Sequence, residues 1–581
     1  MRAARGLTIL AALIPSVAQA ECQITKFLEI PVTMRGDRAI VSAKINGQDA
    51  QFILDSGAFF STLSRASAAA YGLKLEPLPP NFRLMGINGA TSASMTTVQS
   101  FSLGGATLPK IDFIVGGTDT GQVGLLGQNF LGLADVEYDL GHGKVTLLRP
   151  RGCQIGDLPY WAGTRPVSVL PIEARTARQT KTIATVTVNG VKLRAMFDSG
   201  SPGSVLTLAA AKRAGITPNS PGVVAAGFAT GLGSRSVRKW AATFDRLIVG
   251  GESIPKPKIM ISDAEFGDAD MLIGADFFLT HHIYVANKMG KMVMTYEGGT
   301  VFGVSSEGAS DETGKPLDLT DRSAAPTDAE GFARRGAAAM SGRRFEEAIA
   351  DFDQAIARAP AEARFLRQRA AARLANRQPL LAAADLDKAL SIAGDDIEAR
   401  QMRAALKLGT RDPDGAREDI LALDKLLPPT SGARLQLASM ADAAGLQEVG
   451  LANENAWLKS HPEDAQRPTA LNGRCWARAQ LNRELKEALA DCNAALKARP
   501  NTAAYLDSRA LVKLRLGDLA GARADYDAAV QIQPHNAWSL FMRGVAKRRA
   551  GDAAGGEADR RAALAIAPDV ARRAAKIGIS D

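Results

Sequence analysis

The sequence predicts a multidomain protein in which an all-β region of two lobes is followed by an all-α array of helical repeats. Between about residues 25 and 300 the chain is internally duplicated, and its short β-branched and apolar runs between glycine-rich turns are typical of all-β folds. Beyond residue 328, prolines and small residues recur with a 34-residue period, which is typical of stacked helix pairs. The predicted parts are a signal peptide at 1–20, lobes at 21–160 and 161–300, a linker at 301–327 and about seven repeats at 328–581.

The composition of the 581 residues excludes several classes of protein. With 46% hydrophobic and 23% charged residues, the chain has the balance of globular domains rather than of a disordered protein. Four cysteines are too few for a disulfide-built scaffold, and the absence of any run of 18 apolar residues predicts no membrane span. The net charge of +9 comes from basic residues scattered among acids, so we expect a solvated surface and no nucleic-acid partner.

The first twenty residues have the pattern of a secretory signal peptide. Arg2 and Arg5 precede a short apolar stretch, and Ala18-Gln19-Ala20 forms an A-x-A cleavage site. We favour a signal peptide over a buried N-terminal helix. We therefore predict that the mature protein is exported and is periplasmic or secreted.

The four cysteines fall into two couples, and export implies an oxidising compartment in which disulfide bonds persist. Cys22 and Cys153 bracket the first half of the duplication, and Cys475 and Cys492 lie close together in a segment with helical periodicity. We expect pairing within each couple, although four cysteines allow three connectivities. For the second couple, a buried and reduced pair is the alternative.

Each half of the duplication carries an Asp-Ser-Gly triplet directly after three apolar residues. In the first half, the turn signal Asn46-Gly47 is followed by Asp55, eight residues after the glycine. In the second half, Asn189-Gly190 is followed by Asp198 at the same distance. The two triplets therefore occupy equivalent positions in the two halves.

Landmarks downstream of the triplets repeat as well. Each landmark consists of two apolar residues and a glycine: Leu125-Leu126-Gly127 after Asp55, and Leu272-Ile273-Gly274 after Asp198. The separation between aspartate and landmark is nearly the same in the two halves. One Asp-Ser-Gly triplet by itself is typical of a surface turn. Two copies with matched surroundings indicate instead a duplicated functional loop.

These residues resemble the retropepsin-like and pepsin-like aspartic proteases, over roughly half of the chain. In that family each lobe donates one aspartate to a shared cleft, and two apolar residues followed by a glycine support each active-site loop. The resemblance implies that Asp55 and Asp198 form a catalytic pair that activates water, with no metal and no cofactor. It leaves open whether the lobes pair within one chain or between two chains. It also implies supporting roles for Ser56, Gly57, Gly127, Ser199, Gly200 and Gly274.

The family also has a glycine-rich hairpin, the flap, that closes over the substrate. Gly86 follows Asp55, and Gly227 follows Asp198, at similar separations in the two halves. An ordinary solvent-exposed hairpin explains each segment almost as well. Neither segment contains the tyrosine of pepsin-like flaps, which favours the retropepsin branch. The candidate flap residues are Gly86, Ile87, Asn88, Gly89, Gly227 and Phe228.

Other catalytic classes lack their sequence signatures. None of the five histidines belongs to an H-E-x-x-H motif, and no G-x-S-x-G motif occurs. His281 and His282 could ligate a metal, but adjacent residues of a strand point to opposite faces. We therefore expect structural or surface roles for these two histidines.

The C-terminal part resembles the tetratricopeptide repeat, a helix-turn-helix unit of about 34 residues. The positions that close successive units are Pro360, Gly394, Pro428, Pro462, Pro500, Pro534 and Pro568, and their spacing is constant except for one slightly longer interval before Pro500. Eight residues earlier in most units lie Phe352, Leu386, Ile420, Cys492 and Tyr526. The fourth and seventh units are degenerate, because Gly450 and Gly556 stand where alanine is expected.

These patterns predict an exported aspartic endopeptidase that acts on a peptide or protein substrate. Stacked repeats form a concave surface that commonly binds peptides, so we expect the repeats to recruit a substrate or protein partner, with a structural spacer as the alternative. The alternative function is a catalytically silent peptide-binding or scaffold protein that retains the protease fold. Retention of both Asp-Ser-Gly triplets favours the enzyme.

Overall fold

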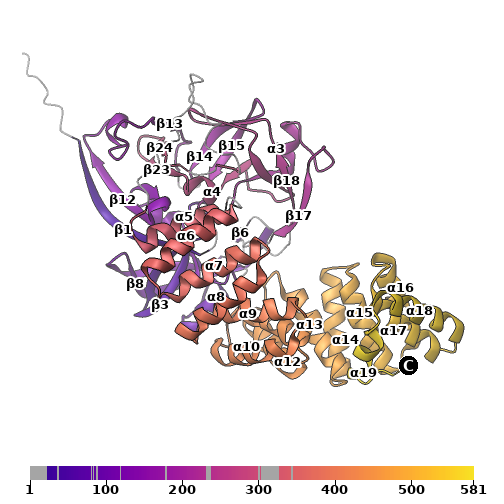
Figure 1. Ribbon diagram of the computed structural model, residues 1–581. Helices are drawn as coiled ribbons and strands as arrows, with labels where there is room; N and C mark the ends of the chain where they lie inside the picture. Colours follow the sequence, from indigo (N-terminus) through magenta and orange to yellow (C-terminus); the bar gives the residue numbers. More distant parts are fainter. Residues whose placement is uncertain are drawn as a thin grey trace, which may run out of the picture.

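The computed structural model describes residues 22–35, 38–79, 82, 84–86, 89–117, 119–176, 180–229, 237–298, 301–302, 326–341 and 344–580. The described residues form two β-rich lobes from which an elongated array of helices extends (Figure 1). The fold class predicted from the sequence is therefore confirmed. The predicted signal peptide, most of the predicted linker and the flap candidates Ile87 and Asn88 lie outside the described residues.

The first lobe is built mainly from β-hairpins. Its elements are β1 (Gln23–Arg35), β2 (Arg38–Ile45), β3 (Gln48–Leu54), β4 (Thr62–Leu63), α1 (Arg65–Ala70), β5 (Glu76–Pro77), β6 (Leu84–Gly86), β7 (Gly89–Thr91), β8 (Ala93–Leu103), β9 (Ala106–Gly116), β10 (Gly124–Leu126), α2 (Gln128–Leu131), β11 (Asp135–Asp139), η1 (Leu140–His142), β12 (Lys144–Arg151) and η2 (Ile155–Asp157). Asn46 and Gly47 form the two-residue turn between β2 and β3, with φ angles of 49° and 84°. Asparagine and glycine adopt these positive angles most easily, so this dipeptide fixes the register of the hairpin.

The second lobe repeats this plan. Its elements are β13 (Ser168–Pro171), β14 (Ile183–Val188), β15 (Val191–Phe197), β16 (Val205–Thr207), α3 (Leu208–Arg213), β17 (Val224–Ala229), β18 (Val237–Thr243), β19 (Arg246–Val249), β20 (Glu252–Pro255), β21 (Lys258–Ser262), β22 (Met271–Ile273), α4 (Ala275–Phe278), β23 (His281–Ala286) and β24 (Lys291–Tyr296). Asn189 and Gly190 form the turn between β14 and β15, with φ angles of 49° and 81°. The duplication seen in the sequence is thus a duplication of structure.

A shared sheet joins the lobes within one chain. It has 13 strands, and those at the lobe boundary lie in the order β13-β24-β23-β11-β12-β1. There β11 of the first lobe pairs antiparallel with β23 of the second. Tyr138 lies opposite Ile283, and Val136 lies opposite Val285. Buried apolar residues of both lobes, including Phe52 and Phe197, belong to one continuous core. The sheet and the core therefore fix the two Asp-Ser-Gly loops relative to each other.

The helical array consists of seven antiparallel pairs and one further helix within the described residues. Its helices are α5 (Ala329–Ser341), α6 (Phe345–Arg358), α7 (Ala363–Ala375), α8 (Pro379–Ile392), α9 (Ile397–Gly409), α10 (Pro413–Leu426), α11 (Ala433–Ala443), α12 (Gln447–Ser460), α13 (Arg467–Gln480), α14 (Leu485–Ala498), α15 (Ala503–Leu516), α16 (Leu519–Ile532), α17 (Ala537–Arg549), α18 (Ala553–Ile566) and α19 (Val570–Lys576). Fully buried alanines, such as Ala348 and Ala382, let the two helices of a pair approach closely. The array is a helical repeat solenoid.

The first part of the solenoid packs against the first lobe, as Figure 1 shows for α5 near β1 and β12. Ala337 of α5 is buried within the core of the lobes. Arg35 at the end of β1 forms an ion pair of 2.9 Å with Glu398 of α9. The solenoid is therefore seated on the lobes through both apolar and charged contacts.

Two disulfide bonds join the cysteines as the sequence led us to expect. Cys22 is bonded to Cys153 and closes the first half of the duplication, and Cys475 of α13 is bonded to Cys492 of α14. No described helix has the length and apolar character that crossing a membrane requires.

Candidate active site

Asp55 and Asp198 begin equivalent loops at the ends of equivalent strands. β3 runs parallel to β10, and the backbone N–H of Asp55 donates a hydrogen bond of 3.0 Å to the carbonyl of Leu126. β15 runs parallel to β22, and the N–H of Asp198 donates to the carbonyl of Ile273 at 2.8 Å. The apolar residues before each aspartate and each downstream landmark thus form a two-stranded platform for the loop.

The two loops are joined by a reciprocal set of four buried hydrogen bonds. The hydroxyl of Ser56 donates to the carbonyl of Phe197 at 2.8 Å and accepts from the N–H of Ser199 at 2.9 Å. The hydroxyl of Ser199 donates to the carbonyl of Leu54 at 2.9 Å and accepts from the N–H of Ser56 at 3.1 Å. Because each serine satisfies backbone groups of the opposite loop, the two aspartates are held in a fixed relation across the lobe boundary.

The glycines of the triplets face the carboxyl groups of the opposite loops. A Cβ atom on Gly57 would overlap the carboxyl group of Asp198, within 2.6 Å of both oxygens. A Cβ atom on Gly200 would lie 2.7 and 2.8 Å from the oxygens of Asp55. A side chain is therefore excluded at both positions by close approach, and the two carboxyl groups meet between the two glycines.

Backbone donors and burial set the protonation of the carboxyl pair. Asp55 Oδ1 accepts from the N–H of Ala58 at 2.7 Å, and Asp198 Oδ1 accepts from the N–H of Gly200 at 3.0 Å. Burial raises the pKa of Asp55 well above its usual value, and the charge of Asp198 raises it further. Burial also raises the pKa of Asp198. Two like charges this close do not both ionise readily, so the pair holds one shared proton.

Gly127 and Gly274 stand beneath the two loops at equivalent positions. A Cβ atom on Gly127 would lie 2.7 Å from the carbonyl oxygen of Phe60, and one on Gly274 would lie 2.6 Å from that of Gly203. The loops therefore lie directly on these glycines. This contact explains why each downstream landmark ends in glycine.

A second layer of polar residues, which the sequence analysis did not single out, supports each loop. Ser61 donates to the side-chain oxygen of Asn129 at 2.8 Å, and its hydroxyl accepts from the N–H of Gly127. In the second lobe Ser204 donates to Asp276 at 2.8 Å and accepts from Gly274. Ser61 and Ser204 each lie six residues after an aspartate. Aligning the two halves residue by residue would have found them.

Two further residues near the pair carried no sequence signal of their own. The charge of Lys181, which precedes β14, lowers the pKa of both Asp55 and Asp198 and so partly offsets burial. The side-chain amide of Gln128 donates to the carbonyl of Ser56 at 2.8 Å. Gln128 has no equivalent in the second half, where Ala275 follows Gly274. By contrast, Lys181 lies 17 residues before Asp198, just as Arg38 lies 17 residues before Asp55.

Both flap candidates belong to β-hairpins. Gly86 of β6 pairs with Gly89 of β7, and the ring of Phe82, just before this hairpin, lies 6.1 Å from the ring of Phe60 in the Asp55 loop. In the second lobe β17 pairs with β18, and Gly227 has a φ angle of 80° at a bulge before Phe228. The hairpin geometry suits a flap, and the role of covering the carboxyl pair remains a proposal.

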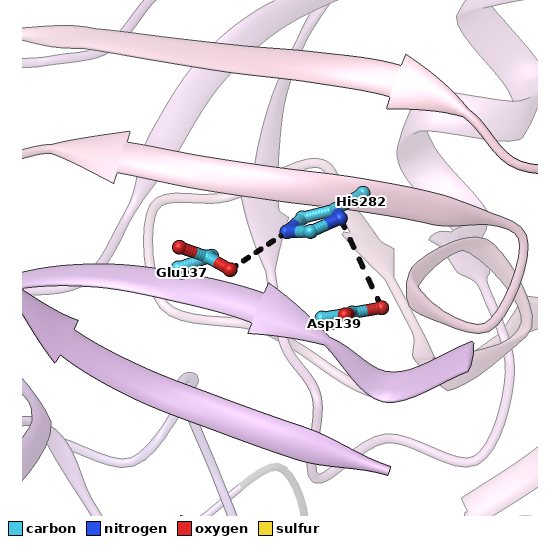
Figure 2. Close-up of side chains that lie close together, drawn as sticks. All are labelled: Glu137, Asp139 and His282. Carbon is cyan, nitrogen blue, oxygen red and sulfur yellow. Dashed lines mark hydrogen bonds and ion pairs between the residues drawn. The ribbon is translucent and has the colours of Figure 1, made fainter. Parts of the chain in front are cut away.

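A separate buried cluster lies on the sheet that joins the lobes (Figure 2). His282 of β23 lies 2.9 Å from Glu137 and 3.9 Å from Asp139, both on β11. The three groups lie within 4.8 Å of one another, a spacing that a metal ion could bridge. Their oxygen atoms already have protein partners, however, because Tyr160 donates to Glu137 and His142 contacts Asp139. The geometry therefore favours a hydrogen-bonded link between the lobes over a metal site.

His281 and His282 point to opposite faces of β23, as expected for neighbours in a strand. The Nε2 atom of His281 lies 2.8 Å from Glu252 of β20, whereas His282 contacts Glu137 of β11. The two imidazoles therefore have separate acidic partners and share no ligand position.

Two stretches of the chain, residues 41–130 and 184–277, match the family model described as aspartyl protease. One match falls in each half of the duplication, and each contains one Asp-Ser-Gly triplet and its downstream glycine. The similarity to the aspartyl protease family therefore covers both halves of the duplicated N-terminal region, and the repeat solenoid lies outside it. A comparison with curated proteins found no match.

The solved structures similar to this chain include helical repeat proteins. One is the APC/C hetero-tetramer Cut9-Hcn1, with 16% identity over 40% of this chain and 44% of that one, at a TM-score of 0.30. A tetratricopeptide repeat protein from Parabacteroides merdae has 15% identity over 43% of this chain and 99% of its own, at a TM-score of 0.34. PilW, a type IV pilus biogenesis factor, has 16% identity over 36% and 94%, at a TM-score of 0.30. These TM-scores are too low to define the fold, and the repeats are defined by their helix pairs and their 34-residue period.

Proposed function

We propose that this protein is an exported aspartic endopeptidase that hydrolyses peptide bonds with water activated by Asp55 and Asp198. The observation that carries the proposal is the meeting of the two carboxyl groups at the lobe boundary, each against the glycine of the opposite loop. The match of each half to the aspartyl protease family supports it.

The shared proton gives the two carboxyl groups complementary roles. The ionised member takes a proton from water as the water oxygen attacks the carbonyl carbon of the substrate, and the neutral member donates a hydrogen bond to the carbonyl oxygen. In the resulting tetrahedral intermediate a proton passes to the amide nitrogen as the C–N bond breaks, which releases a carboxylic acid and an amine. The four hydrogen bonds between Ser56 and Ser199 and their loops keep the pair in register during these transfers.

Export is supported by the two disulfide bonds and by the pattern of the first twenty residues. Disulfides persist in oxidising compartments, and both couples of cysteines are bonded here. The proposed location is a periplasm or the exterior of the cell.

The repeats are proposed to recruit a substrate or partner protein to the lobes. The architecture of the solenoid supports this role, because stacked helix pairs present long continuous surfaces to a partner. The hairpins at Gly86–Gly89 and Gly227–Phe228 are proposed to close over the bound peptide, which would exclude water other than the attacking molecule.

The test is cleavage of an unbiased peptide library from acid to neutral pH by the wild type, Asp55→Asn and Asp198→Asn. We expect activity over a limited pH range, because the pair must hold one proton and one charge. Each asparagine variant is expected to lose at least about a hundredfold in rate, since it removes a proton-transfer group. Asp49→Asn is the matched control, because Asp49 is exposed and lies in the strand that leads to Asp55.

The control is expected to retain the wild-type rate. Cleavage that survives both changes would contradict the proposed mechanism. Peptide binding without cleavage by the wild type would instead support the alternative, a catalytically silent peptide-binding protein.

A further inference from the structure

The fourth repeat carries an acid at a position that is apolar in most other repeats. Phe352, Leu386, Ile420, Cys492 and Tyr526 each lie eight residues before the end of their unit, and each is at most 1% exposed. Glu454 lies at the same distance before Pro462 and is 6% exposed. A buried carboxylate between packed helices lowers the stability of the fold unless a partner group offsets its desolvation. The burial of Glu454 therefore requires such a partner group.

The same repeat lacks the ion pair that joins the helices of the others. In six repeats an arginine of the first helix is bonded to an aspartate of the second: Arg335–Asp351, Arg369–Asp385, Arg403–Asp419, Arg474–Asp491, Arg509–Asp525 and Arg543–Asp559. In the fourth repeat the equivalent residues are Leu437 and Asn453. The fourth repeat therefore lacks the aspartate that forms the ion pair in the other repeats, and it has instead a glutamate, Glu454, that forms no ion pair among the described residues.

Glu454 faces a cavity of about 220 Å³ between α11, α12 and α13. The lining includes the apolar Leu435, the acid Asp442 and the indole of Trp476, and the exposed Ser439 stands where the cavity reaches solvent. A Cβ atom on Gly473 would overlap the carboxyl group of Glu454. Glycine at this position therefore makes room for the acid inside the solenoid.

Two acceptors in the cavity have no donor among the described residues. Glu454 Oε2 and Asn472 Oδ1 are both buried without a hydrogen bond. Asp442 is satisfied, because its carboxylate accepts from the indole N–H of Trp476 at 3.1 Å and from Gln480. A buried acceptor without a donor costs about 1–3 kcal/mol, so the cavity is suited to a ligand that brings N–H groups.

The charges around Glu454 are mixed. Burial raises the pKa of Glu454 well above its usual value, and the carboxylates of Asp442 and Asp491 raise it further. Arg474 and Arg478 act in the opposite direction, but both donate to Asp491. A cation inside the cavity would stabilise the ionised form of Glu454 directly.

We propose that this cavity binds an organic cation with several N–H donors, namely an alkylammonium or guanidinium group. Such a group would supply donors to Glu454 and Asn472, place its charge beside the indole of Trp476 and pack its alkyl stem on Leu435. The source is a lysine or arginine side chain of a bound peptide or a free amine. This proposal rests on the recruiting role that we propose for the repeats, because it names the chemistry that they would bind. Binding can be measured without cleavage, so the two proposals can fail separately.

The experiment is calorimetric titration of the full-length protein with four probes. The cationic probes are n-butylammonium, acetyl-Gly-Lys-Gly-amide and acetyl-Gly-Arg-Gly-amide, and the uncharged control is acetyl-Gly-norleucine-Gly-amide. We expect at least one cationic probe to bind and the norleucine peptide not to bind. Tighter binding of a tripeptide than of butylammonium would identify a peptide side chain as the source, and the reverse order would identify a free amine.

Variants of the chain make the assignment specific. Glu454→Gln is expected to weaken binding by tenfold or more, because it removes the charge and keeps the shape. Glu454→Leu introduces the residue found at position 386 and keeps the test valid if the glutamine variant does not fold. Glu448→Gln, an exposed acid on the same helix, is the matched control and is expected to change binding less than twofold.

Three results would overturn the proposal. They are no binding of any cationic probe to the wild type, equal binding to the Glu454 variants, and equal binding of the norleucine peptide.

Discussion

Asp55 occupies a site that favours its neutral form. Burial and the nearby charge of Asp198 both raise its pKa, while one backbone N–H and the more distant Lys181 offset only part of this effect. In the unfolded chain an aspartate ionises near pH 3.9. Above that pH the folded protein therefore holds a proton that the unfolded chain releases, and folding becomes less favourable as the pH rises towards the raised pKa.

Replacing Asp55 by asparagine removes this penalty. We expect Asp55→Asn to raise the free energy of unfolding at pH 7 by roughly 0.5–2 kcal/mol, the usual range for one stabilising change at a functional site. Well below pH 3.9 the carboxyl group is mostly neutral in both states, so the difference should become small. Thermal unfolding of wild type and variant at about pH 3 and pH 7 measures the difference. A difference that stays constant with pH would contradict the assigned protonation.

The close approach at Gly57 predicts a loss of activity without a change of charge. In Gly57→Ala the new methyl group would lie within 2.6 Å of the oxygens of Asp198, so the two loops must separate. We expect the proposed cleavage to fall by about a hundredfold or more, because small displacements of reacting groups are that costly. Gly156→Ala is the control, since no atom lies within 4 Å of its Cβ position. Equal rates for the two variants would contradict the close packing of the carboxyl pair.

At this scale the sequence indicated the two aspartates that the structure brings together, and it missed the residues around them. Asp55, Asp198 and their glycines were predictable because duplicated triplets mark them. Ser61 and Ser204 were visible only in a residue-by-residue alignment of the two halves. The effect of Lys181 on the pKa values of the pair could not be predicted, because it depends on how the chain brings β14 to the lobe boundary.

The repeated arginines form a ladder along the solenoid at the scale of helices. Five of these arginines bond the aspartate of their own repeat and also donate to an aspartate or asparagine in the second helix of the previous repeat. These second bonds join Arg369 to Asp353, Arg403 to Asp387, Arg474 to Asn455, Arg509 to Asn493 and Arg543 to Asp527. The ladder thus ties neighbouring repeats together as well as the two helices of each pair. In the fourth repeat Leu437 takes the place of the arginine, and Arg434 instead bonds Asn453 of its own repeat and Asp424 of the previous repeat.

The fourth repeat suggests how one ladder pair can be replaced. Asp419 is fully buried and bonded to Arg403. Burial acts to raise its pKa, but Arg403 and Lys407 outweigh burial and hold the pKa below its usual value. Arg403→Leu or Asp419→Asn alone removes the bond between the two helices, but Arg400 and Lys407 still contact Asp419, and Asp387 still contacts Arg403. We therefore expect a loss of about 1–3 kcal/mol for each single variant. The double variant reproduces the residues of the fourth repeat and should lose about 1–3 kcal/mol less than the sum. Urea unfolding followed by helical circular dichroism gives the four values, and strict additivity would contradict the pairing.

Helices and local hairpins were predictable, whereas the pairing of distant strands was not. The 34-residue period located the helix pairs, and Asn46-Gly47 and Asn189-Gly190 located two hairpins, because these signals are local. The pairing of β11 with β23 joins residues that lie far apart in the sequence, such as Val136 and Val285. No local pattern encodes it, so the sequence left open whether the two lobes pair within one chain.

At the scale of the whole molecule, the solenoid contacts a loop that leads into the two-stranded platform beneath Asp55. The N–H of Asp119 donates to Asp464 at 2.9 Å, and its carboxylate lies 3.1 Å from His461, both in the turn between α12 and α13. β10 begins five residues after Asp119, and the carbonyl of its Leu126 accepts a hydrogen bond from the N–H of Asp55. The solenoid is thus connected to the carboxyl pair through a short stretch of chain.

This connection predicts a local change in hydrogen exchange when the contact is removed. Asp464→Ala takes away a charged acceptor, so the Asp119 amide should exchange roughly tenfold faster or more, with a smaller increase along β10. Glu463→Ala is the matched control, because Glu463 also contacts the first lobe, at Ser92 and Arg65, but not Asp119. Mass spectrometry of peptides covering residues 119–126 distinguishes the two variants. If both leave exchange in this stretch unchanged, the solenoid is seated on the lobe without restraining the loop, and its position has no bearing on the platform of Asp55.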